Sequence, residues 1–75
     1  MPNLKPDARI GKRAYAEVVR HFGKLTKARD ALGVTYVTLW KWREDGAAPS
    51  AFYLSKMVEH DIDVIYILTG RRNNG

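Results

Sequence analysis

The sequence predicts an all-α fold, a compact bundle of about five short helices. Apolar residues recur at helical spacing, and glycine or proline follows most of the periodic stretches. The one segment with strand-like composition has no second strand with which it could pair. These observations together favour helices over a sheet.

The first helix is predicted at about residues 10–22. Residues 1–9 contain two prolines and no apolar periodicity, so we expect them to form a flexible basic arm. Gly23 is a suitable stop for the helix. One apolar residue in every four marks its buried stripe: Ile10, Ala14, Val18 and Phe22.

A second helix is predicted at about residues 25–32, ended by Gly33, which adopts a left-handed backbone without steric penalty. Residues 34–42 are ambiguous because valine, threonine, tyrosine and tryptophan favour strands. Thr35 can cap a helix, and a lone strand would be unstable. A third helix at about residues 36–44 is therefore expected.

Two more helices complete the predicted bundle. Ser50 can cap a fourth helix at about residues 51–60, and Asp63 can cap a short fifth one at about 64–69. A single domain is thus expected at residues 10–70, followed by a frayed basic tail at 71–75.

The size and composition exclude several function classes. Seventy-five residues leave no room for a deep catalytic cleft, so a binding module is expected and an enzyme is not. The chain has no cysteine, which suits a cytosolic location and removes zinc fingers and disulfides. His21 and His60 lack companions at metal-ligand spacing. We expect no metal, no cofactor, no membrane association and no small-molecule substrate.

The positive charge is concentrated in the first part of the chain. The net charge is +5, but residues 1–29 hold eight Lys or Arg against two acids, which gives +6. Residues 30–75 hold five against six, which gives −1. This polarity is expected if one face of the domain meets a polyanion. A solvated basic surface is the alternative reading.

The second and third predicted helices, joined by a short turn at Gly33, have the outline of a helix-turn-helix. In such a pair the second helix lies in the major groove of DNA. Leu39 and Trp42 share the face that would pack under the second helix. Together with Thr35, the residues of the opposite face are expected to contact bases: Tyr36, Val37, Trp40, Lys41 and Glu44.

Side-chain chemistry suggests a role for each of these residues. Val37 and Trp40 suit thymine methyl groups, Lys41 suits guanine, Glu44 suits cytosine, and Thr35 and Tyr36 suit phosphates or base edges. A protein interface remains an alternative for Trp40. Lys5 and Arg9 of the arm could add groove contacts. Phosphate contacts are expected from four further residues: Thr26, Lys27, Arg29 and Arg43.

The predicted fifth helix is apolar on every side, and so small a core can cover only part of it. The remainder is expected to form a two-fold dimer interface. The residues expected there are Phe52, Tyr53, Val64, Ile65, Ile67 and Leu68.

Two runs of the sequence resemble a known family. His21-Phe-Gly23, Ala31-Leu-Gly-Val34, Leu39, Trp42-Arg43, Gly46 and Pro49 occur in the order found in the Cro-like branch of phage repressors, within the lambda-repressor-like DNA-binding superfamily. The run from Asp63 to Arg72 resembles the end of the DNA-binding domain of phage repressors. The resemblance covers about residues 15–72. It departs from the family at Arg29, where a small buried residue is usual; either Ala28 takes that role, or Arg29 extends toward a phosphate.

The resemblance implies a phage or prophage transcriptional repressor that binds a palindromic DNA operator as a homodimer, formed either in free solution or only on DNA. A DNA-binding antitoxin of a toxin–antitoxin pair is one alternative. The N-terminal DNA-binding domain of a longer phage repressor is another. A small basic RNA-binding protein is a third, although the chain lacks the aromatic strands typical of single-strand readers.

Overall fold

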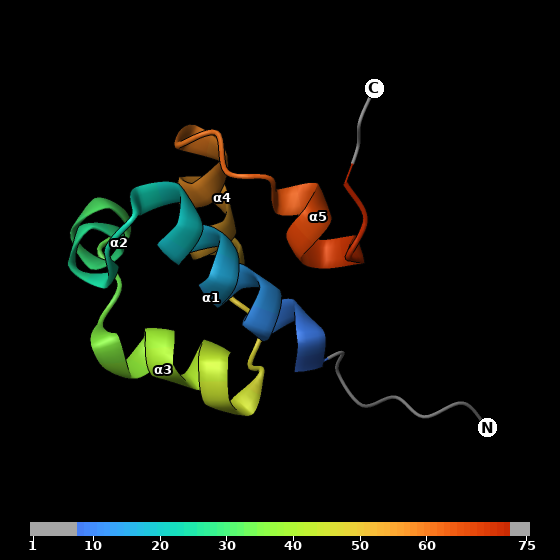
Figure 1. Cartoon of the computed structure of the whole chain (residues 1–75), viewed down its shortest axis with the longest axis horizontal. Coiled ribbons are helices and arrows are strands. Elements are labelled where there is room, and N and C mark those ends of the chain that lie inside the picture. Colours follow the sequence, from blue (N-terminus) through green and yellow to red (C-terminus); the bar gives the residue numbers. More distant parts are fainter. Residues whose placement is uncertain (1–7, 73–75) are drawn as a thin grey trace.

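Residues 8–72 of the computed structural model are described, and they fold into five helices without a strand (Figure 1). This confirms the predicted all-α bundle, including a helix where the composition is strand-like. The helices are α1 (Ala8–Phe22), α2 (Leu25–Leu32), α3 (Tyr36–Asp45), α4 (Ala51–Glu59) and α5 (Val64–Thr69).

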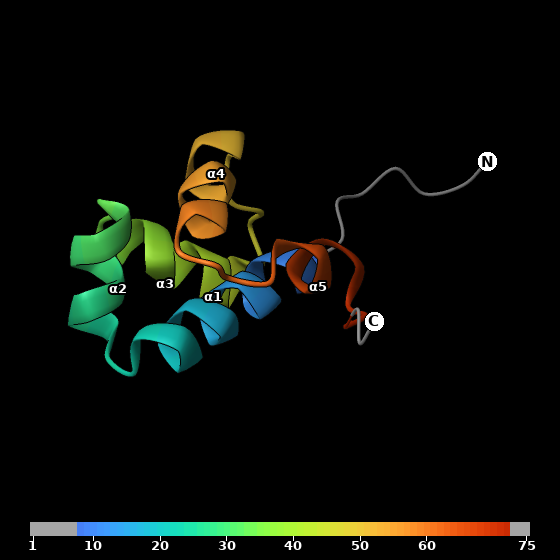
Figure 2. The same ribbon diagram turned by 90° about the horizontal axis from the view of Figure 1, so that it is seen from above.

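Helix α1 is the centre of the bundle. It contacts α2, α3 and α5, whereas α4 packs on α2 and α5 and stands out from the rest when the molecule is seen from above (Figure 2). Gly11 in α1 faces the connection between α3 and α4, where a Cβ atom would overlap the backbone of Gly46 and Ala47. Glycine therefore allows α1 to approach this connection closely.

Between residues 8 and 72 the core contains ten buried apolar residues, of which Trp42 of α3 is the largest. Its side chain is 2% exposed, and its ring meets that of Tyr53 edge to face at 5.8 Å between centroids. A buried aromatic residue contributes a large apolar area to so small a core. The core residues are Ala14, Val18, Ala28, Leu32, Val34, Leu39, Trp42, Met57, Ile62 and Ile67.

The predicted helix caps are confirmed. Each capping oxygen accepts a hydrogen bond from an amide that has no partner within its own helix. Gly33, at the turn between α2 and α3, has a φ of 67°, which explains why glycine is found there. The caps are Thr35 on the amide of Thr38 (3.2 Å), Ser50 on that of Tyr53 (3.5 Å) and Asp63 on that of Tyr66 (2.9 Å).

The predicted start of the first helix is wrong by two residues. Helix α1 begins at Ala8, so the predicted arm is too long at its end, while residues 1–7 lie outside the described part. The apolar stripe, which begins at Ile10, marks the packed side of a helix but not its first hydrogen-bonded turn.

The two interpretations of Arg29 can now be compared. Ala28 is fully buried and supplies the small packed residue before the turn. Arg29 lies along the surface, where its guanidinium stands 4.8 Å from the ring centroid of Tyr36 and 2.9 Å from the carboxylate of Asp30. Helix α2 therefore packs through Ala28, and a phosphate contact of Arg29 stays a prediction.

A buried carboxylate ties the end of the described chain to α1. Glu17 is 3% exposed and pairs with Arg20 (2.9 Å) and Arg72 (2.5 Å), and Arg72 also lies 3.3 Å from Asp63. These four residues are called the Glu17 cluster. The predicted frayed tail is therefore wrong at Arg72; residues 73–75 lie outside the described part.

The Glu17 cluster also determines how Glu17 ionises. Burial opposes ionisation of the carboxyl group, but hydrogen bonds and charge from Arg72 and Arg20 outweigh it and lower its pKa to about 2. Nearby, the Nε of Arg13 donates to the carbonyl of Ile67 at 2.8 Å, which holds α5 against α1. No local pattern in the sequence indicates this network, because Arg72 lies 55 residues from Glu17.

None of the helices between residues 8 and 72 combines the length and the apolar character that crossing a bilayer requires.

Candidate nucleic-acid interface

Helix α3 has one buried and one exposed side, as predicted, but the buried side packs chiefly on α1 and not, as predicted, under α2. Leu39 and Trp42 are 1% and 2% exposed, and they anchor the helix in the core. The side chains on the other side form what we call the outer face of α3. All of its members are exposed, and they come from the same helix turns: Tyr36, Val37, Trp40, Lys41 and Glu44.

The outer face is unusually apolar for a surface. Val37 is 63% exposed and Trp40 is 53% exposed, although both side chains are apolar and nothing in the described chain covers them further. Contiguous exposed apolar groups commonly mark contact sites. The outer face therefore has the character of a binding surface.

Besides Arg29, three of the predicted contact residues already have polar partners. The Thr35 hydroxyl caps α3, and it also lies 3.1 Å from the hydroxyl of Thr38. Arg43 donates to Glu44 at 2.7 Å, and this contact raises the pKa of Arg43. Both of these side chains are about half exposed, so the pair is a surface one that a stronger partner can replace.

The start of α2 lies open to an anion. Thr26 and Lys27 are exposed, and the residue before the helix, Lys24, provides no side-chain cap. The first amides of α2 therefore have no capping partner from that residue, and such amides suit a phosphate group. Lys24, Lys27 and Lys41 form no ion pair with any residue between 8 and 72.

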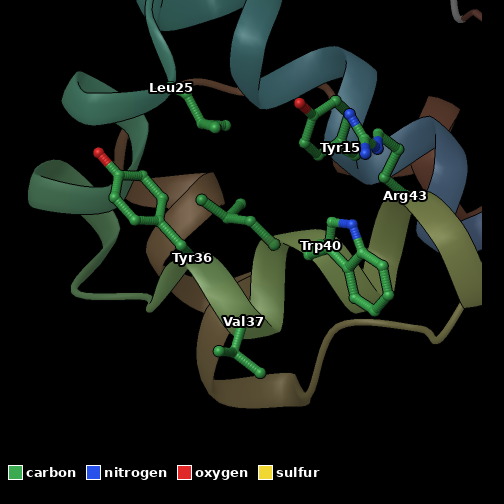
Figure 3. Close-up of a pocket in the computed structure, with 7 residues that line it drawn as sticks. Tyr15, Leu25, Tyr36, Val37, Trp40 and Arg43 are labelled. Carbon is green, nitrogen blue, oxygen red and sulfur yellow. The ribbon is translucent and has the colours of Figure 1, made fainter.

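A hollow of about 530 Å³ adjoins the outer face of α3. Figure 3 shows Leu25, Tyr36, Tyr15 and Trp40 arranged around it, with Arg43 beside the Tyr15 ring. Nothing in the sequence marks Tyr15 and Leu25 as lining residues, because each continues the apolar spacing of its own helix. Both are only partly buried.

The predicted dimer interface is wrong at Ile67. This residue is fully buried within the single chain, in the core between α5 and its neighbours, so it has no surface to offer a second copy. The other five residues keep some exposure: Phe52 at 60%, Ile65 at 57% and Leu68 at 41%, with Tyr53 and Val64 half-buried. Tyr53 packs on Trp42. Phe52 lies in the first turn of α4, whereas α5 follows the last turn of that helix.

Of the two arm residues predicted to contact a DNA groove, only Arg9 lies within the described part of the chain. Lys5 lies outside the described residues. Arg9 is exposed in the first turn of α1.

Comparisons with known proteins identified no relative of this chain. No protein-family model, curated protein or solved structure matched the chain.

Proposed function

We propose that the protein is a sequence-specific regulator of transcription that binds double-stranded DNA, a repressor of the Cro type. The observation that carries the proposal is the outer face of α3, where exposed Tyr36, Val37, Trp40 and Lys41 stand on a helix held firmly by Trp42. An α-helix fits the major groove, and these side chains would reach the base edges there.

The charges around α3 support this placement. Lys27 and the uncapped amides of α2 would hold one phosphate, while Arg43 and Arg29 would reach others. Lys41 would donate to guanine, Val37 and Trp40 would contact thymine methyl groups, and Glu44 would accept from cytosine after leaving Arg43.

Exposed apolar residues on α5 support a dimer. Ile65 and Leu68 would meet their counterparts across a two-fold axis, which would place two recognition helices about one DNA turn, roughly 34 Å, apart. The dimer would occupy a palindromic operator in the bacterial cytosol and exclude polymerase.

Selection of binding sites from random duplex DNA tests this proposal. We expect one enriched palindromic sequence with two half-sites about one helical turn apart. On the selected duplex, Lys41→Ala should cost about 1 to 3 kcal/mol and relax the preference at one base pair. If no sequence is enriched, or if Lys41→Ala binds every duplex as the unchanged chain does, the proposal fails.

The exposed Phe52, Ile65 and Leu68 favour a second candidate, a DNA-binding antitoxin whose other partner is a toxin protein. A toxin would cover these apolar side chains. Stable co-purification of a second protein, lost in an Ile65→Glu variant, would favour this candidate over a free repressor.

A further inference from the structure

The hollow beside α3 has a shape and a lining that DNA does not explain. Its walls come from three helices, with Tyr15 on α1, Leu25 on α2 and Tyr36 and Trp40 on α3 (Figure 3). The major groove offers thymine methyl groups as its only apolar feature, and a methyl group fills a small fraction of about 530 Å³. Another occupant therefore fits the hollow better.

The size and the lining correspond to a small organic molecule. Ligand sites in proteins commonly measure about 300 to 1,000 Å³, and they combine apolar or aromatic walls with a few polar groups. Three aromatic rings and Leu25 provide the walls here. Flat rings of a ligand would stack on or meet these aromatic side chains.

The charge at the rim of the hollow indicates an anionic group on the ligand. Arg43 lines the hollow, is half exposed and stands 5.7 Å from the ring centroid of Tyr15. Arg29 does not line the hollow, but its guanidinium stands 4.8 Å from the ring centroid of Tyr36, which does. Glu44 and Asp30 are the acids paired with these arginines, and both pairs are exposed, so a carboxylate can displace them at small cost.

We propose that this hollow binds an aromatic carboxylate of one or two rings, with the rings between Tyr15, Leu25 and Trp40 and the carboxylate on Arg43. Tyr36, Trp40 and Arg43 belong both to the hollow and to the surface assigned to DNA. If the proposed function holds, the ligand also regulates DNA binding. The bound acid competes with the operator and acts as an inducer.

Binding is tested without DNA, by NMR titration of the ¹⁵N-labelled full chain. The probes are 2-naphthoate and its uncharged analogue 2-naphthalenemethanol. We expect saturable shifts at the amides of Tyr15 and Leu25 and at the indole of Trp40. Arg43→Gln should weaken 2-naphthoate about three- to tenfold and leave the alcohol within about twofold, because only the acid uses the guanidinium.

Two controls complete this experiment. Phe52→Ala removes an exposed aromatic ring outside the hollow and should leave both affinities unchanged. Arg43→Lys should restore part of the affinity for 2-naphthoate. Shifts centred on Phe52 or α5, the absence of saturable shifts, or equal loss of acid and alcohol in Arg43→Gln would each overturn the site.

Competition with the selected duplex separates this site from the proposed function. We expect 2-naphthoate to displace the duplex from the unchanged chain. It should displace the duplex less well from Arg43→Gln, after correction for the weaker duplex binding of that variant. If 2-naphthoate binds in the hollow and the duplex binds equally well beside it, α3 does not lie in the groove. That outcome overturns the inducer role and the placement of α3 in the groove, while the ligand site and sequence-specific DNA binding stand.

Discussion

Two regions of the molecule place their cations in opposite situations. In the Glu17 cluster, between α1 and α5, Arg20 and Arg72 are paired with carboxylates of the same chain. Around the start of α2 and on α3, Lys24, Lys27 and Lys41 form no ion pair with any of residues 8–72. Paired charges stabilise the fold, whereas unpaired ones remain available to an external anion.

Helix α3 shows a similar contrast within one element. Its inner side is buried in the core, whereas its outer face is exposed. We expect Trp42→Ala to lower the free energy of unfolding by about 3 to 5 kcal/mol, since it leaves a large cavity in the core. Trp40→Ala should change it by less than about 0.5 kcal/mol. Urea denaturation followed by circular dichroism measures both. Equal destabilisation would mean that the outer face of α3 also supports the fold.

The Glu17 cluster provides the next test of the comparison. Glu17→Gln should lower the free energy of unfolding by about 2 to 4 kcal/mol, because Arg20 and Arg72 lose a buried carboxylate. Glu44→Gln removes the exposed partner of Arg43 and should cost less than about 0.5 kcal/mol. The same denaturation experiment compares them. A loss as small for Glu17→Gln as for its control would show that the cluster is dispensable.

Acid should weaken the cluster within a defined pH range. The pKa of Glu17 is about 2 in the folded chain, below its ordinary value of 4.5, so its contribution is complete above pH 4.5 and is lost as the pH falls toward 2. We expect about 2 to 3 kcal/mol to disappear over this range. The difference in stability between the unchanged chain and Glu17→Gln, measured at each pH, isolates this contribution. A difference that stays constant with pH would contradict it.

The fold could be predicted from the sequence because local signals agree with one another. The caps at Thr35, Ser50 and Asp63 and the turn at Gly33 depend on short-range chemistry that the residue types reveal. Strand-like composition in α3 was outweighed by packing of Leu39 and Trp42, as tertiary contacts often override propensity.

The features that could not be predicted depend on contacts between distant parts of the chain. Arg72 reaches Glu17 across 55 residues, and no pattern in the sequence pairs them. Ile67 and Ile65 are both apolar and lie two positions apart, yet only the first is buried. The hollow likewise arises from the angles between three helices. The sequence marks Tyr36, Trp40 and Arg43 only as DNA contacts, and it gives Tyr15 and Leu25 no signal beyond ordinary apolar spacing.

The proposed dimer surface offers a smaller test. Ile65→Glu should weaken binding of the selected palindromic duplex by about 1 to 2 kcal/mol, because a charge would lie between the two copies. Val58→Glu, an equally exposed position on α4, is the matched control and should have little effect. Sedimentation on the duplex reports both stoichiometry and affinity. A strict monomer on a palindromic duplex would exclude the dimer.

The central claim, that the unpaired Lys27 at the start of α2 meets a DNA phosphate, is tested most directly by the salt dependence of binding to the selected duplex. With about 6 to 10 phosphates neutralised per dimer, the slope of log K against log salt should be roughly −5 to −9. Two copies of Lys27→Gln should reduce its magnitude by about 2, and Lys56→Gln on α4 should leave it unchanged. An unchanged slope for Lys27→Gln, or an equal reduction for Lys56→Gln, would contradict the account.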